Sequence, residues 1–418
     1  MTDKTYKVFL TPLVSEGTYG DEIEISNFVK TANLSSIKKN TDSEDFNIGD
    51  YRLGSISLTC TNYCGEFNDN DPRSFFVYKS ANSKIRVVYF DSLTESSGSF
   101  KGLVSDEGTS FSAEDDTAKL KILANDSIID TVQVQGGTLD NGDLFSDALK
   151  ALLNVPAITA VLTFDSDEIE VALDLAIDTV TPLSNISTWQ AVRQLLIASN
   201  SVLYIDDETI KVKTRDENTQ NVSYFYGPGD TLDRENIIKI TDYNNGAQRI
   251  FNSIKINDTL YTDEVSEEWF GLSQKPFTMD FITDSDKELL IAKQLVNQFR
   301  YPRLEFKLTC TTQLANQIDF FDTIGVSHPI KARPYRTTNA PLWDLAKYDT
   351  AEDVFPIDFG GVNIPGNLAF QIIQRIENPK EFQTTLKLRG RGKTFDDGLL
   401  VFWNSAYGFS LYDVSTWG

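Results

Sequence analysis

Residues 186–215 read ISTWQAVRQLLIASNSVLYIDDETIKVKTR, which is the pattern of a helix followed directly by a β-hairpin. Ser187 and Gln190 have the spacing of a capping box, in which side chains satisfy the first free N–H groups of a helix. The apolar residues of this helix recur three and four apart and predict its buried face: Trp189, Val192, Leu195 and Leu196. After Asn200, SVLYI and TIKVKTR read as two strands around a tight turn at Asp206–Asp207. This stretch therefore predicts a small α/β unit.

The preceding residues extend that unit, which we expect to span residues 116–225. AKLKILANDSII (118–129) reads as a strand, and a second helix is predicted after residue 140 by an apolar stripe at helical spacing. The stripe consists of Leu144, Phe145, Ala148, Leu149 and Leu152. The segments VPAITAVLTF (155–164) and EIEVALDLA (168–176) are predicted to be strands.

Residues 1–115 read as strands throughout. The predicted strands are 6–14, 21–29, 51–60, 84–92 and 97–105. Polar clusters between them predict turns, namely SEGTYGD (15–21), KKNTDSEDFNIGD (38–50), NDNDP (68–72) and SANS (80–83). Short strands at regular spacing with turn residues between them favour a sandwich or a barrel, so we expect an N-terminal β-barrel-like domain.

Residues 226–395 predict a second barrel-like domain. Its strands are expected at 236–243, 249–258, 303–310, 322–328, 369–378 and 381–390. One helix interrupts them at 284–299, with Ser285 and Glu288 as a capping box and Pro302 just beyond its end. Its expected core face is Leu289, Ala292, Leu295, Val296 and Phe299. Residues 331–368 form a long irregular loop, and loops of this length are usually functional or ordered by a partner. The fold class is therefore mainly β with an α+β insert.

The last 23 residues, 396–418, form an aromatic C-terminal segment. It contains Phe402, Trp403, Tyr407, Phe409, Tyr412 and Trp417, about 26% of the segment against 11% of the whole chain. Aromatic side chains with polar spacers suit a contact surface. Two contacts remain open for it: an edge of its own second domain, or a neighbouring subunit that it anchors.

Charge and hydropathy exclude several classes of protein. The chain has 418 residues with 38 basic and 61 acidic side chains, a net charge of −23. Such a surface repels phosphates, so we expect no specific nucleic-acid binding, although an acidic wall would let DNA slide past. No stretch reaches the roughly 18 apolar residues of a membrane span. The N-terminus lacks the pattern of a signal peptide, so we expect folding in a cytosol.

Cysteine and histidine offer little chemistry. The complete set is Cys60, Cys64, Cys310 and His328. Within one strand, Cys60 and Cys64 would lie roughly 13 Å apart, which does not suit a disulfide or a shared metal. Buried structural thiols are the preferred interpretation, and a zinc site is the alternative. A lone His328 before Pro329, with no GxSxG elbow, does not indicate a catalytic triad.

Three further motifs favour structural interpretations. Gly392-Lys393-Thr394 matches the end of a phosphate-binding loop, but Lys387 stands where that motif needs its first glycine. NDNDP lacks the glycine and distal glutamate of an EF-hand and reads as an Asn/Asp turn. Paired carboxylates of a glycosidase are not singled out among 61 acids. The sequence thus predicts no catalytic, cofactor-binding or metal-binding residue, no cofactor and no enzymatic activity.

Four stretches, taken in order, resemble the trimeric tail hub proteins of bacteriophages, the baseplate-hub and tail-tip family. The first is the helix and hairpin at 186–215, and the second is NIIKITDYNNGAQRIFNSIKI (236–256), similar to the entry into the second barrel of the family. The third is AKQLVNQFRYPRLEFKLTCTTQLANQIDFFDTIGV (292–326). The fourth is AFQIIQRIENPKEFQTTLKLRGRG (369–392), which resembles a closing hairpin. The resemblance covers roughly residues 100–395.

The resemblance implies two tail-tube-like β-barrel domains, three copies of which supply six barrels at the tip of the tail. It implies a structural virion protein that joins the tail tube or distal-tail ring to the fibre or spike. We expect a homotrimer around a channel for DNA ejection, with the tape-measure protein in the lumen and assembly in the host bacterial cytoplasm. Two alternatives stay open: a hexameric distal tail protein, and a receptor-binding or carbohydrate-cleaving tail protein.

Overall fold

The computed structural model describes most of residues 5–326 and three pairs of strands beyond them. The described residues are 5–33, 37–41, 51–52, 54–69, 71–91, 96–107, 109–112, 114–206, 208–215, 222–226, 237–244, 250–300, 305–316, 318, 323–326, 356–359, 362–365, 369–378, 383–390, 399–400 and 412–413.

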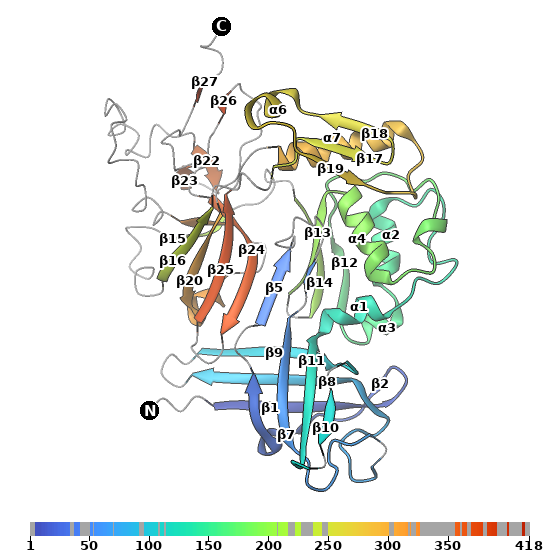
Figure 1. Cartoon of the computed structure of the whole chain (residues 1–418), viewed down its shortest axis with the longest axis vertical. Coiled ribbons are helices and arrows are strands. Elements are labelled where there is room, and N and C mark those ends of the chain that lie inside the picture. The colour runs from blue at the N-terminus through green and yellow to red at the C-terminus, as the bar shows by residue number, and fades with distance from the viewer. Residues whose placement is uncertain are drawn as a thin grey trace.

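A nine-stranded sheet forms one end of the molecule, at the bottom of Figure 1. Its main order is β2-β1-β8-β9-β11-β7-β4, with β3 on β1 and β10 on β11. The strands are β1 (Thr5–Ser15), β2 (Thr18–Tyr19), β3 (Ile23–Glu24), β4 (Val29–Asn33), β7 (Ser55–Thr61), β8 (Lys79–Asp91), β9 (Ser96–Val104), β10 (Ser110–Ser112) and β11 (Thr117–Ala124). Their inward residues alternate with outward ones, as Ile56, Leu58 and Cys60 do in β7.

This sheet bends sharply but does not close into a barrel among the described residues. The bend between β9 and β11 needs Gly102, because a Cβ there would clash with the carbonyl oxygen of Leu123. A 3₁₀ turn at Ser26–Phe28, between β3 and β4, contacts β1 in place of a further strand. Val8 N–H of β1 donates to Ser26 Oγ (2.9 Å), and Ile25 N–H donates to Val8 O (2.8 Å). The mainly β class is thus confirmed, with open sheets in place of closed barrels.

The SANS segment is not a turn. Residues 80–83 lie within β8, where Asn82 adopts a φ of +63°. The pairing of β1 with β8 shifts register between Thr11 and Leu13, beside this segment. A β-bulge absorbs the polar residues without ending the strand, so the prediction of a turn there was wrong.

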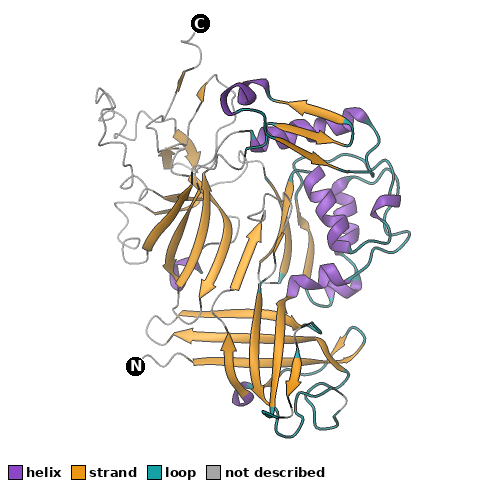
Figure 2. Ribbon diagram, in the orientation of Figure 1, coloured by secondary structure: helices purple, strands orange, loops and turns teal. Residues whose placement is uncertain are grey.

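The central α/β unit contains four helices and a three-stranded sheet, and Figure 2 shows its helices gathered on one side of the molecule. Its elements are α1 (Ile128–Thr131), α2 (Phe145–Leu153), α3 (Pro156–Thr159), β12 (Thr163–Ile169), α4 (Thr188–Ala198), β13 (Ser201–Asp206) and β14 (Thr209–Thr214). Both predicted helices and the hairpin are confirmed. The Ser187 side chain accepts a hydrogen bond from Gln190 N–H at 3.2 Å, as the cap requires.

Several details of this unit differ from the predictions. The predicted strand 168–176 is confirmed only at Glu168 and Ile169, where β12 ends. The segment 155–164 contains α3 rather than one strand, because Pro156 occupies the first turn of a helix, where its missing N–H costs nothing. The hairpin loop consists of residues 207–208, one residue later than expected, since Asp206 pairs with Thr209.

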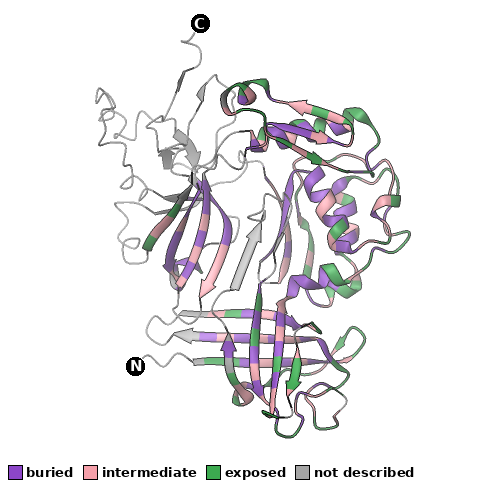
Figure 3. Cartoon of the chain, viewed as in Figure 1, coloured by how far each residue is buried: buried purple, intermediate pink, exposed green. Residues whose placement is uncertain are grey.

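Residues 250–300 build a further small unit that packs against the central one. It consists of β17 (Ser253–Ile256), β18 (Thr259–Thr262), α6 (Glu264–Phe270), β19 (Gln274–Phe277) and α7 (Ser285–Phe299). Phe281 meets Phe145 edge-on at 6.2 Å, and Lys287 forms an ion pair with Asp178. One continuous apolar core runs through both units, as the purple segments of Figure 3 show.

The predicted helix 284–299 is confirmed, but its cap is not the predicted one. Asp284, not Ser285, is the N-cap, and it accepts a hydrogen bond from Asp286 N–H. Glu288 is 7% exposed and binds the side chains of Asn257 and Thr259 instead.

The second large sheet has eight strands in the main order β15-β21-β24-β25-β20-β16. They are β15 (Val222–Tyr226), β16 (Ile237–Asn244), β20 (Glu305–Thr311), β21 (Thr323–Val326), β24 (Ala369–Asn378), β25 (Gln383–Gly390), β5 (Ile37–Thr41) and β6 (Tyr51–Arg52). Helix α8 (Thr312–Ala315) follows β20. The closing hairpin β24–β25 is confirmed, and Phe306 packs edge-on against Phe370 at 4.8 Å in the core beneath it.

Strand β5 comes from the N-terminal part of the chain. It pairs with β24 from Glu377↔Ile37 to Gln374↔Asn40, while β4 and β7 on either side of it in sequence belong to the first sheet. The sequence placed a turn at 38–50, and that prediction was wrong for residues 38–41. Domain boundaries at 115, 225 and 395 remain predictions. Strand β11, which begins at Thr117, pairs within the first sheet, and β5 pairs within the second.

Only short pairs of strands are described toward the C-terminus. Within the predicted loop 331–368, β22 (Pro356–Phe359) pairs with β23 (Val362–Pro365). In the aromatic C-terminal segment, β26 (Leu399–Leu400) pairs with β27 (Tyr412–Asp413). The rest of both segments lies outside the described residues. Among the helices that the structure describes, none has the length and apolar character of a membrane span.

Candidate interaction site

The three cysteines do not form a common site. Cys60 and Cys310 are buried in different sheets and Cys64 is exposed, and all three thiols are free. Burial raises the pKa of Cys60 and of Cys310 to about 12, so both thiols stay protonated and are poor nucleophiles or metal ligands. His328 lies outside the described residues. The described part of the chain holds no cluster of three or more ligand side chains that would suit a metal ion.

Of the positions that define the phosphate-loop motif, the structure describes only the first, Lys387. Lys387 lies within β25, where its ammonium is 3.3 Å from Glu305 Oε2, and β25 ends at Gly390. Gly392, Lys393 and Thr394 lie outside the described residues. Lys387 is therefore a strand residue with a carboxylate partner.

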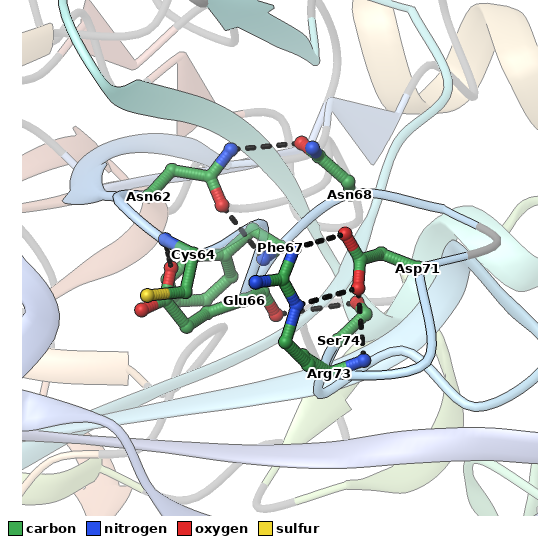
Figure 4. A network of polar contacts seen from close by, with 8 residues as sticks. All are labelled: Asn62, Cys64, Glu66, Phe67, Asn68, Asp71, Arg73 and Ser74. Carbon is green, nitrogen blue, oxygen red and sulfur yellow. Dashed lines mark hydrogen bonds and ion pairs between the residues drawn. The ribbon is translucent and has the colours of Figure 1, made fainter.

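The loop from Asn62 to Tyr78, between β7 and β8, is the most developed irregular segment that the structure describes. It is held by hydrogen bonds within itself, drawn in Figure 4. Asn62 Nδ2 donates to Asn68 Oδ1 (2.8 Å), and Asn62 Oδ1 accepts from Phe67 N–H (3.0 Å). Phe75 N–H donates to Glu66 O (2.7 Å), which joins the two limbs of the loop. Its backbone is therefore braced without a helix or strand.

The acidic residues of this loop bind partners within the protein. Asp71 accepts from Arg73 Nε (3.2 Å) and Nη2 (3.1 Å), and Asp69 accepts from the N–H (2.7 Å) and hydroxyl (2.9 Å) of Ser80. Arg73 N–H also donates to Asp71 Oδ1 (2.9 Å), and a carboxylate that accepts the backbone N–H two residues on is typical of an Asx turn. These contacts support the prediction of an Asn/Asp turn at 68–72.

Four phenylalanines anchor the loop to the first sheet. Phe67 is completely buried, and its ring meets those of Phe28, Phe75 and Phe76 edge-on at 6.1, 5.4 and 6.1 Å. Phe28 and Phe75 are 5.1 Å apart. Edge-to-face pairs of this kind add to the free energy of burial. The loop thus has an apolar base that is continuous with the core of the sheet.

Three large apolar or aromatic side chains of the loop are exposed to solvent. Tyr63 is 69% exposed, Val77 66% and Tyr78 53%. Lys30 of β4 lies 5.8 Å from the centre of the Tyr63 ring. We call Tyr63, Val77 and Tyr78 the loop patch. Tyrosines on a rigid frame suit protein contacts, because they bury much area at little conformational cost.

Replacing Gly65 by alanine should loosen this loop. Gly65 has a φ of +81°, and a Cβ there would clash with Asp71 Oδ2. We expect a loss of about 1–2 kcal/mol from backbone strain and a smaller further loss because Asp71 must shift away from its contacts with Arg73, measured by chemical unfolding. Gly17→Ala is the matched control, since Gly17 has a φ of +71° but nothing within 4 Å. Equal losses in the two variants would show that the Asp71 contact is unimportant.

The loop patch and strand β5 were not predicted from the sequence. The phenylalanines around the NDNDP turn, FNDNDPRSFF (67–76), are the signal that the sequence offers for the loop. The four stretches that resemble the tail hub family fall on α4–β14, β16–β17, α7–β21 and β24–β25.

Comparison with known proteins finds similar structures. No family model matches the sequence, and no curated protein matches it. The structure is similar to a tail protein from Neisseria meningitidis MC58 (13% identity, TM-score 0.49), over 94% of this chain and 98% of that one. It is also similar to prophage tail protein gp18 from Listeria monocytogenes EGD-e (12% identity, TM-score 0.47; 93% and 96% covered). A third is the 43 kDa tail protein of prophage MuSo2 from Shewanella oneidensis (10% identity, TM-score 0.45; 92% and 96% covered). All three of these proteins are tail proteins.

Proposed function

We propose that this chain is a structural protein of a bacteriophage tail, the hub at the distal end, and that it works as a homotrimer. The observation that carries the proposal is the joining of two large, mostly antiparallel sheets by β5: the chain leaves the first sheet after β4 and pairs through β5 with β24 of the second. A single chain thereby holds two large β-sheets in one connected body. The stretches that resemble the hub family lie in the second sheet and the two α/β units.

Three copies of a chain with two such units place six units around an axis. That number would match a sixfold tail tube to a threefold tip. Closed cyclic assemblies cover exposed strand edges with neighbouring subunits, and each of these open sheets has edges to cover. The proposed neighbours are the distal tail or tail tube protein on one side and the fibre or spike protein on the other, with the tape-measure protein in the lumen.

The loop patch is proposed as one contact with a neighbouring tail protein. It is rigid, aromatic and exposed, which are properties of interface anchors. The lumen is proposed to be lined by acidic and neutral residues, because a net charge of −23 disfavours adhesion of DNA during ejection. The role is proposed to be structural, without catalysis.

The mass of the purified assembly tests the proposal. We expect three times the 46.9 kDa of the chain, measured by light scattering or native mass spectrometry. A mass of six chains would favour a hexameric distal tail protein. A stable monomer within assembled tails would contradict a hub. Cleavage of host oligosaccharides by the purified chain would favour the carbohydrate-cleaving alternative.

A further inference from the structure

The first sheet has an apolar core of its own. Its buried residues, from Val8 in β1 to Ile122 in β11, form one cluster, and the buried residues of the other units form a second. Leu103 of β9 is an exception: it is a buried side chain of the first sheet, but it belongs to the second cluster. Separate cores mean that the first sheet keeps its packing when its orientation toward the other units changes.

Leu103 of β9 and the partly buried Tyr19 of β2 pack against the second cluster, and the other contacts that orient the first sheet are polar and come from a few side chains. Glu208 accepts hydrogen bonds from Lys101 Nζ (2.7 Å) and Asn125 Nδ2 (3.0 Å), and Lys84 Nζ donates to Ala160 O (2.9 Å). On the other side, Tyr89 Oη donates to Glu377 Oε2 (2.8 Å). The Lys101 and Glu208 side chains are 29% and 34% exposed, so water can replace their partners.

Glu208 occupies a position that favours glycine. It is the second residue of the two-residue loop between β13 and β14, and its φ is +70°. In such hairpin loops glycine is the preferred residue at that position, because the left-handed region strains any side chain with a Cβ. The strain of a glutamate there is offset by the contacts of its carboxylate with Lys101 and Asn125.

Tyr89 is also held in a special position. Its ring covers Gly98 on the neighbouring strand, where a Cβ would clash with the ring, and the side chain is 3% exposed. Burial, and next the charge of Glu377, raise the pKa of Tyr89, so its hydroxyl keeps the proton that it donates. Arg375 holds Glu377 in turn, with Nε 2.8 Å from Glu377 Oε1.

We infer that the first sheet is a hinged body, tethered to the rest of the chain by β5 and η2 (Asn125–Ser127) and held at one angle by three latches: Glu208, the Lys84–Ala160 contact and the Tyr89–Glu377 pair. The tethers are backbone and survive rotation. The latches are side-chain contacts, and their release keeps the cluster of the first sheet intact and uncovers only Leu103 and Tyr19 where they pack against the second cluster. The device lies within one chain and does not depend on the proposed place in a tail.

Distances between two spin labels on the full chain test the hinge. The labels are placed at Ser57→Cys on β7 and Asn154→Cys after α2, both exposed, in a Cys64→Ser background so that no other exposed thiol reacts among the described cysteines. We expect a single narrow distance with native latches. With Glu208→Gly, Lys84→Met and Tyr89→Phe together we expect a distribution at least twofold broader. These substitutions relax the strained φ and keep the Tyr89 ring, so both cores should remain folded.

Two controls make the result decisive. Glu170→Ala removes an ion pair with Lys213 inside the central unit, 3.1 Å long, and should leave the distance narrow. Hydrogen exchange at Leu58 and Leu203 reports whether the two cores persist in the latch variant. An unchanged narrow distance in the latch variant overturns the inference. So does loss of protection in either core, which would make these contacts part of folding, and so does a broad distance with native latches.

Discussion

Phe67→Ala is expected to lower the free energy of unfolding of the first sheet by about 3–5 kcal/mol, the range for a buried phenylalanine. Phe67 has no exposed surface and contacts Phe28, Phe75 and Phe76. Its removal leaves a cavity at the base of the loop between β7 and β8. Because this base positions the loop patch, the variant should also assemble poorly. Chemical unfolding and the mass of the assembly measure the two effects.

The variant Tyr63→Ala separates the effect on assembly from the effect on stability. Tyr63 is 69% exposed, so its loss should change stability little, while assembly should weaken if the loop patch contacts a neighbour. Phe111→Ala is the control for general loss of exposed aromatic surface, since Phe111 is 41% exposed on β10. Full assembly of the Tyr63 variant would remove the loop patch from the interface, and a Phe67 variant of native stability would contradict the packing argument.

Local signals were predicted well from the sequence. The helix α4 was recognised because its cap and its apolar face lie within a few residues of one another, and Ser187 makes the expected bond. The same holds for the buried face of α7, where Ala292, Leu295 and Val296 are completely buried. Patterns of this kind depend on neighbours three and four residues away, which any single sequence displays.

Non-local pairing explains the main errors. IKKNT (37–41) has low β propensity and reads as a turn, yet it forms β5 because β24 supplies its hydrogen-bond partners from more than 300 residues away. Glu288 was interpreted as a capping residue, but Asn257 and Thr259 bind its carboxylate. The left-handed Glu208 also has no local signature, since its partners Lys101 and Asn125 lie on other elements. Tertiary partners decide such positions, and spacing along the chain does not display them.

Proline in β5 should have the largest effect on assembly. In an antiparallel ladder, adjacent residues direct their N–H groups to opposite sides. Lys38 pairs with Ile376 and Lys39 with Arg375, so one of the two directs its N–H toward β24. Proline at that residue removes a ladder bond. It leaves a carbonyl of β24 unpaired in a strand whose Gln374 is 2% exposed, at a cost of about 1–3 kcal/mol. We expect the second sheet to lose its connection to the first and the trimer to be lost.

The variants Lys38→Pro and Lys39→Pro serve as matched controls for each other. At these two residues β5 pairs with β24 alone, because its pairing with β6 is confined to Asn40 and Thr41. The proline whose position faces away from β24 should therefore assemble far better than the other, although composition and charge are the same in both variants. Light scattering gives the assembled mass and thermal unfolding gives the stability of each. Trimers from both variants would mean that β5 is dispensable, and the joining of the two sheets would no longer support a hub. Equal loss in both would point to a general intolerance of proline in this segment, with the same consequence for the proposal.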